Sequence, residues 1–378
     1  VERLVLLKLN VCAALALLVC AVGCPGPSGG EGEGEGGAGE GEGAAGEGEG
    51  AGCASDPVLG SLVVGDNWIV AGDQGISSDI NTVGISVQGG TSEIFGLTFD
   101  LHVVDVGVFP GGTTLIPPVV FDAVSAADQG LARGTDDFGS FLVVDGPFLA
   151  AGYARASDHG GSVAGVDNAS AAAPTLVDAP SNFAGARRGD VLLLESAGAG
   201  DDTDGLGVFA FAGEPSTWTA ATPTTFATLG ASAVGSGNIA ATAGGIVVFG
   251  RFSSSNDLYA VSSASADAIL AGGAAIDAEG ETPFLSTGLN GSGQAMVDFG
   301  EGVVFATADS TFTQFAVQHV DLTDNGADVS ASAADDVVTG GSPSCTSINF
   351  VTHSNIAEEL LIGVSDAAGS RLVQVRHK

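Results

Sequence analysis

The sequence predicts an all-β body built from repeated units, and two observations lead to this fold class. Apolar runs of four to six residues recur between clusters of Gly, Asp, Asn and Ser, the pattern of short buried strands bounded by turns. In addition, Gly235–Phe249 aligns with Gly291–Phe305 without a gap at an offset of 56 residues, with identities along Gly-Ser-Gly and Val-Val-Phe. A fixed offset of this size indicates a repeated supersecondary unit.

The expected strands follow one pattern along the chain. A short apolar run reaches a tight turn such as Gly65-Asp66 or Asp145-Gly146, and a longer apolar run follows. The middle runs are apolar on both faces, as in sheets that are covered on both sides. In chain order the strands are expected at 62–64, 68–71, 83–87, 94–99, 101–109, 119–121, 141–144, 148–153, 163–166, 191–194, 208–211, 246–252, 258–261, 303–305, 312–320, 360–364 and 372–375.

The spacing of these runs favours a ring of blades. Strands that start at Val191, Ile246, Val303 and Leu360 are separated by 55, 57 and 57 residues. Four-stranded units at such spacing resemble a β-propeller, in which radial stacking protects most sheet edges. We expect six or seven four-stranded blades, because the 80 residues between Trp68 and Phe148 hold either an insertion or a degenerate blade. The alternative is a pair of tandem β-sandwich domains, which also shows regularly spaced strands.

The N-terminal residues have the pattern of an export signal. Arg3 and Lys8 precede an apolar run at 11–22, which is too short to cross a hydrocarbon core of about 30 Å as a helix. The run ends in Ala21-Val22-Gly23-Cys24. This resembles the lipobox of bacterial lipoproteins, although Ala21 stands where those families usually have Leu. The resemblance implies that residues 1–23 are a lipoprotein signal peptide, that Cys24 carries a lipid, and that the body lies at the outer membrane or cell surface. An ordinary signal peptide cut nearby is the alternative.

Residues 24–52 are expected to form a disordered tether. This segment consists mainly of Gly, Glu and Ala, and so offers little apolar surface to offset the entropy of ordering. It would separate a membrane anchor from a folded domain at residues 53–378. Two cysteines remain in that domain, Cys53 at its start and Cys345 near its last unit. In an exported protein such a pair favours a disulfide, here one that closes the ring; two unpaired cysteines are the alternative.

Charge limits the classes of partner. The 378 residues contain 45 acidic and 10 basic side chains, a net charge of −35. Such a surface repels phosphate backbones, so no nucleic-acid partner is expected, and a charged partner would be cationic. Arg187-Arg188 is the one paired basic site of the body. It would either receive an anion or form ion pairs with neighbouring Asp residues, and the second is favoured.

No motif indicates a catalytic or cofactor site. The five histidines, His102, His159, His319, His353 and His377, have no metal-ligand spacing and are expected at turns or on the surface. No Gly-x-Ser-x-Gly elbow stands between a strand and a helix. The acidic turn around Asp321, Thr323, Asn325 and Asp328 loosely resembles a calcium loop, but Ser332 stands where such a loop has Glu. A solvated turn is the alternative to a calcium site there.

These observations favour a non-catalytic binding or scaffold module, anchored by lipid and exposed at the envelope, with a protein or polysaccharide ligand. The alternative is a propeller enzyme, a hydrolase or lyase acting on polysaccharide. Propeller active sites are assembled from several blades and leave no local motif, so the sequence does not decide between the two.

Overall fold

The computed structural model describes residues 62–76, 80–88, 91–98, 102–107, 119–122, 137–155, 160–167, 175–180, 182–196, 207–218, 223–230, 233, 235–290, 295–308, 314–341, 347–353, 358–366 and 369–378. Cys24, Cys53, Cys345 and the predicted tether lie outside these residues. The described chain is all-β apart from two short helices, η3 (Pro215–Thr217) and α3 (Ser263–Leu270). No helix in these ranges is long and apolar enough to span a bilayer.

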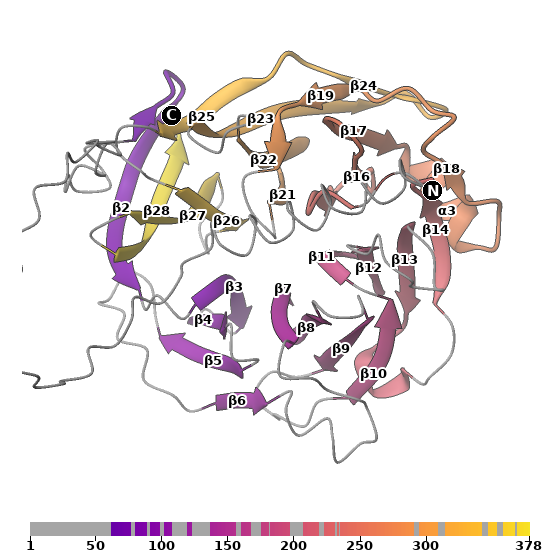
Figure 1. Cartoon of the computed structure of the whole chain (residues 1–378), viewed down its shortest axis with the longest axis horizontal. Helices are drawn as coiled ribbons and strands as arrows, with labels where there is room; N and C mark the ends of the chain where they lie inside the picture. The colour runs from indigo at the N-terminus through magenta and orange to yellow at the C-terminus, as the bar shows by residue number, and fades with distance from the viewer. Residues whose placement is uncertain are drawn as a thin grey trace, which may run out of the picture.

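The strands form six sheets arranged around an axis (Figure 1). Blade I holds β3 (Ile80–Gln88), β4 (Thr91–Thr98), β5 (His102–Gly107) and β6 (Val119–Asp122). Blade II holds β7 (Asp137–Asp145), β8 (Phe148–Arg155), β9 (Gly160–Val166) and β10 (Thr175–Pro180). Blade III holds β11 (Asn182–Arg188), β12 (Val191–Ser196), β13 (Gly207–Ala212), β14 (Thr224–Thr228) and β18 (Ile276–Asp277).

The remaining strands complete the ring. Blade IV holds β15 (Ile239–Ala241), β16 (Val247–Phe252), β17 (Asn256–Val261) and β19 (Leu285–Thr287). Blade V holds β20 (Leu289–Asn290), β21 (Met296–Phe299), β22 (Gly302–Ala308), β23 (Gln314–Asp324), β24 (Val329–Ala331), β25 (Asp335–Gly341) and the edge strand β1 (Val63–Val64). The composite sheet holds β2 (Trp68–Ile76) with β26 (Ser347–His353), β27 (Glu359–Asp366) and β28 (Gly369–His377).

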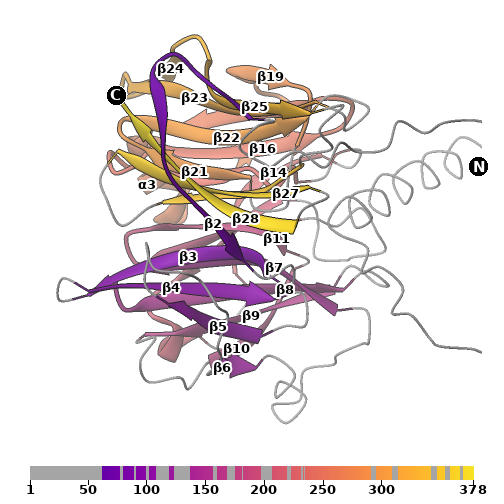
Figure 2. The same cartoon turned by 90° about the vertical axis from the view of Figure 1, so that its left-hand side faces the viewer.

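The inner strands confirm the propeller arrangement. Strands β3, β7, β11, β15, β21 and β26 contact one another in a closed circle, which a pair of sandwiches would not produce. The composite sheet closes the ring, because β2 pairs with β28 from Trp68↔His377 to Ile76↔Ser370 (Figure 2). The second and last described strands are thereby hydrogen-bonded to each other.

The predicted count of six or seven four-stranded blades needs correction. Five blades draw their main strands from continuous stretches of chain, whereas the remaining sheet is a composite of both ends. Blades III and V hold five and seven strands instead of four. The extra strands β1, β18, β20 and β24 are only two or three residues long, and of these only β1 corresponds to an apolar run that was expected as a strand, at 62–64.

The core lies between neighbouring sheets. Leu193 of blade III packs in one cluster with Phe249 and Tyr259 of blade IV, and Val248 packs with Val303 and Phe305 of blade V. The side chains of Val248 and Phe305 are both 0% exposed, which confirms that the repeated Val-Val-Phe segments are buried between stacked sheets. A central strand such as β22, in which all seven residues are buried, buries both faces because its sheet has a neighbour on either side.

Candidate functional site

A cavity of about 830 Å³ lies at one end of the central axis. It is lined by residues of the inner strands β7, β11, β15, β21 and β26 and of the turns that follow them. Among the described lining residues the deeper positions are aliphatic, for example Leu142, Ile239 and Met296. The acidic, basic and histidine side chains form the mouth of the channel. Asp267 lies on α3, and the others stand at or near the carboxyl ends of the inner strands: Asp145, Arg187, Arg188, Asp190, Asp298 and His353.

Arg187 links blade III to blade II at this mouth. Its guanidinium lies 3.5 Å from Asp145 and 3.2 Å from Glu214, and stacks over the ring of Phe148 at 3.9 Å from the centroid. Its Nε donates to the carbonyl of Gly189 at 2.8 Å. The side chain is only 14% exposed, so these contacts hold the charge in one place.

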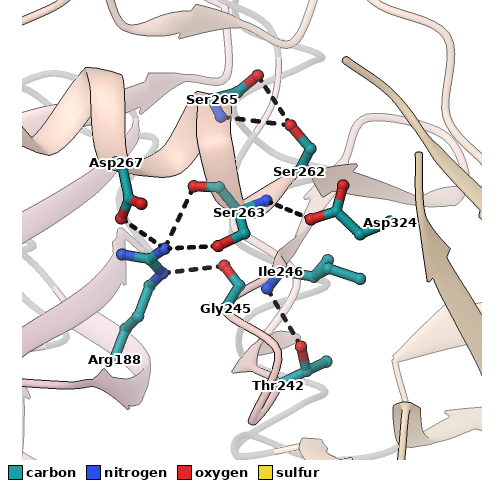
Figure 3. A network of polar contacts seen from close by, with 9 residues as sticks. All are labelled: Arg188, Thr242, Gly245, Ile246, Ser262, Ser263, Ser265, Asp267 and Asp324. Carbon is teal, nitrogen blue, oxygen red and sulfur yellow. Dashed lines mark hydrogen bonds and ion pairs between the residues drawn. The ribbon is translucent and has the colours of Figure 1, made fainter. Parts of the chain in front are cut away.

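Arg188 makes the corresponding link to blade IV (Figure 3). Its Nε donates to the carbonyl of Gly245 at 2.9 Å, and its Nη2 lies 2.8 Å from Asp267. The same Nη2 donates to the carbonyl and hydroxyl oxygens of Ser263, both at 3.3 Å. Successive strand residues point to opposite faces, so adjacent arginines reach opposite neighbours. The expected ion pairs with Asp are confirmed, and both guanidiniums are already engaged within the protein.

Asp298 and His353 meet on neighbouring inner strands. Asp298 Oδ1 lies 2.7 Å from His353 Nε2, and the side chains are 33% and 48% exposed. Both line the cavity. Sequence reasoning missed this pair because it sought clusters that are local in sequence. The spacing could have indicated the pair, because the two residues are 55 positions apart and successive blades repeat at about this interval.

A buried carboxyl group lies away from the cavity lining. Glu195 of β12 is 0% exposed, and its carboxyl oxygens accept hydrogen bonds from Gly237 N at 2.6 Å and Gly250 N at 3.2 Å. Burial raises the pKa of Glu195 to about 8, although these backbone amides oppose the shift. The first Gly-Ser-Gly copy is therefore the polar contact of blade IV with a buried glutamate of blade III.

The segment considered as a calcium loop forms a β-hairpin. Asp321 and Thr323 lie on β23, whereas Asn325 and Asp328 lie in the turn to β24, where Asn325 N donates to the carbonyl of Asp328 at 3.0 Å. The neighbouring Asp324 accepts a hydrogen bond from Ser263 N at the start of α3, at 2.9 Å (Figure 3). Within the described ranges no group of three or more His, Cys, Asp or Glu side chains is placed to hold a metal. The calcium site stays a prediction.

Among known proteins, solved structures of low sequence identity resemble this chain. No protein-family model matches the sequence, and no curated protein matches it. Solved structures that resemble the chain include a prolyl endopeptidase from a study of two such enzymes, at 11% identity and TM-score 0.40 over 79% of this chain and 42% of the other. Prolyl oligopeptidase B from Galerina marginata matches at 12% identity and TM-score 0.43 over 82% of this chain and 43% of the other. A puromycin-hydrolyzing peptidase of Mycobacterium tuberculosis matches at 12% identity and TM-score 0.40 over 64% and 36%. The chain thus spans less than half the length of each of these three structures.

Proposed function

We propose that this protein is a binding module of a bacterial envelope, and that its ligand engages the mouth of the central channel. The observation that carries the proposal is the cavity of about 830 Å³, with an aliphatic wall below a charged mouth. A concave, largely pre-formed site of this size with a few convergent polar groups is typical of ligand binding. The described groups with shifted pKa values, Glu195, Tyr259 and His319, all lie outside its lining, which favours binding over acid–base catalysis.

The chemistry of the mouth favours a ligand that joins an aliphatic chain to a cationic group. Asp145, Asp190, Asp267 and Asp298 line the cavity. Asp145 and Asp267 pair with Arg187 and Arg188, so Asp190 and Asp298 are the carboxylates in excess of the arginines there. The ring of His353 is the one aromatic group among the described lining residues, so platforms for stacking sugars are lacking in that part of the wall. A lysine side chain of a partner protein fits both features, with its stem on the aliphatic wall and its ammonium group at the carboxylates.

Attachment to the membrane is part of the proposal. A lipid on Cys24 and the tether at 24–52 would hold the propeller clear of the outer membrane or cell surface, and a Cys53–Cys345 disulfide would lock its closure. Labelling with a fatty-acid analogue should mark the wild-type protein and not C24A; equal labelling of both contradicts the anchor. Peptide mapping without reductant should recover Cys53 linked to Cys345, and free thiols at both positions contradict the disulfide.

Binding at the mouth is tested with a hexalysine peptide and its fully acetylated form. Calorimetric titration should detect the first and not the second, because acetylation removes the charge. Binding should weaken from 0.1 to 1 M salt as the Debye length shrinks from ~10 Å to ~3 Å. D298N should weaken binding at least threefold, whereas D328N, in the exposed β23–β24 turn, should leave it unchanged. Equal binding of both peptides, or equal effects of both variants, contradicts the proposal.

The Asp298–His353 contact favours one alternative function. A carboxylate that holds an imidazole at 2.7 Å in a cavity is an arrangement suited to general base catalysis, as a propeller hydrolase or lyase would need. Incubation with a panel of polysaccharides decides between the two. If the wild type releases shortened sugar and H353A does not, the enzyme is supported. If the protein retains a partner and releases no shortened sugar, the binding module is supported.

A further inference from the structure

The ring is closed at a seam between blade V and the composite sheet. Strand β1 pairs with β25 of blade V, and four residues later β2 begins in the composite sheet. Gly65 N donates to the carbonyl of Val337 at 2.9 Å, and Trp68 N donates to the carbonyl of Gly65 at 3.0 Å. A Cβ on Gly65 would lie 1.7 Å from the carbonyl oxygen of Asp336, so this crossing has no room for a side chain. The chain is therefore held tightly where it passes from one sheet to the other.

Trp68 anchors the first residue of β2 at this seam. It is 2% exposed, and its ring centroid lies 5.3 Å from that of Phe299 in blade V and 5.0 Å from that of His377 in β28. Its indole Nε1 donates to Asp335 Oδ2 at 3.3 Å. Asn67 Nδ2 lies 3.4 Å from the same oxygen. One carboxylate of blade V thus holds the start of the strand that closes the ring.

His319 faces the same carboxylate from the adjacent strand. It is the direct cross-strand partner of Asp335, and such partners have their Cβ atoms about 5 Å apart on one face. Its side chain is only 12% exposed, which corrects the expectation that every histidine lies at a turn or on the surface. Its ring also contacts Trp68 and Phe299 edge-on, at 6.1 and 5.6 Å between centroids.

The imidazole has an unused polar atom. His319 Nε2 is buried and makes no hydrogen bond to the described part of the chain. The carboxylate oxygen of Asp321, on the same strand, lies 3.5 Å away without forming one. A neutral imidazole tolerates this position, whereas a protonated one carries a charge and two N–H donors that need acceptors. The nearby acceptors are Asp321 and Asp335, and Asp335 already binds Trp68.

We propose that His319 is an acid-sensitive latch on the propeller closure. When His319 gains a proton, it competes with the Trp68 indole for Asp335, and the start of β2 is released from blade V. The groups that face it are Asp321 on its own strand, Asp335 on β25, His377 on β28, and the rings of Trp68 and Phe299.

The direction of the pH effect follows from the burial. Desolvation lowers the pKa of His319; the charges of Asp321 and Asp335 oppose this shift, and His377 adds to it. The open seam therefore binds a proton more readily than the closed one as the pH falls below the usual histidine value of about 6.5. Closure is most stable above that pH and loses stability as the pH falls toward the lowered pKa. One proton taken up on opening increases the open fraction by up to about tenfold per pH unit in this window.

Trp68 fluorescence in a W218F background of the full chain reports the latch, because Trp68 is then the sole tryptophan. Between pH 8 and 5 we expect a reversible shift of its emission to longer wavelength, with a midpoint below 6.5. H319Q should abolish this transition, whereas H377Q should keep it although His377 also touches Trp68. Loss of the transition in H377Q alone, or its survival in H319Q, overturns the proposal.

Hydrogen exchange of the wild-type chain tests the same step without a substitution. After correction for intrinsic exchange rates, amides of β2 should lose protection between pH 7.5 and 5, while amides of β16 keep theirs. The NMR titration midpoint of His319 should coincide with the Trp68 transition. Unchanged protection of β2, or two distinct midpoints, contradicts the latch even if H319Q fails to fold.

Discussion

Arg371 and Asp73 form a two-pronged ion pair between the last strand of the described chain and the first strand of the composite sheet. Arg371 Nε and Nη2 lie 2.6 Å from Asp73 Oδ1 and Oδ2, respectively, across a separation of 298 residues. Asp73 is 16% and Arg371 34% exposed, so water screens the pair only in part. Backbone hydrogen bonds already hold β2 to β28. The two-pronged ion pair in addition fixes the orientation of the two side chains across these strands, which come from opposite ends of the described chain.

Removing one charge of this pair should weaken ring closure. We expect D73N to lower the free energy of unfolding by roughly 2 kcal/mol, since hydrogen bonds to charged groups contribute about 1.5–3 kcal/mol. Denaturant melts measure the loss. The matched control is D66N, whose carboxylate lies in the exposed turn before β2 and should cost less than 0.5 kcal/mol. Equal losses in both variants would mean that the pair contributes nothing to closure.

Glu195 should make stability depend on pH in the opposite sense to His319. Its pKa is raised from 4.5 to about 8 in the folded protein, so the folded state keeps a proton that the unfolded state releases. Stability is therefore highest below about pH 4.5 as far as this group is concerned, and it falls as the pH rises to about 8. The slope in that window is at most about 1.4 kcal/mol per pH unit.

The variant E195Q isolates this contribution. Glutamine keeps the size of the side chain and does not titrate, so the difference in unfolding free energy between E195Q and the wild type should shift in favour of E195Q from pH 5 to 8. Urea melts at several pH values measure it. A difference that stays constant over this range would mean that Glu195 is ionised throughout. E214Q, at an exposed carboxylate, serves as the control.

More of the architecture than of the candidate site could be predicted from the sequence. Strands β16 and β22 each carry the apolar Val-Val-Phe run that recurs at an offset of 56 residues, and burial on both faces explains why this run is apolar. The Asp298–His353 pair leaves no local pattern, because two strands of different blades bring it together. In the sequence Glu195 resembles an exposed polar residue at the end of an apolar strand. It is buried because backbone amides of the next blade donate hydrogen bonds to its carboxyl group. Contacts between blades depend on how the blades stack, which local sequence does not encode.

Phe305 should be essential to the stacking of blades IV and V. Its side chain is 0% exposed in the cluster that joins these sheets, so F305A should cost roughly 3–5 kcal/mol through the cavity that it leaves. V63A removes an apolar group that is 67% exposed, and should change stability by less than about 0.5 kcal/mol. Denaturant melts compare the two. A loss under 1 kcal/mol for F305A would mean that the sheets do not stack closely at this position.

Arg188 should hold blades III and IV together through carbonyl oxygens more than through its ion pair. The Asp267 carboxylate is 68% exposed, so D267N should cost less than about 1 kcal/mol. R188K keeps the charge but loses the planar fork that reaches Gly245 and Ser263 together, and leaves those carbonyl oxygens without their donor. We expect R188K to cost about 1–3 kcal/mol. In the double variant the combined loss should fall below the sum of the two single losses, because the Nη2 atom that R188K removes is also the atom that pairs with Asp267, and residues in direct contact are coupled. Denaturant melts of the wild type, D267N, R188K and the double variant measure the free energies of unfolding for this double-mutant cycle. A loss in R188K no larger than that in D267N would assign the link between the blades to the ion pair instead.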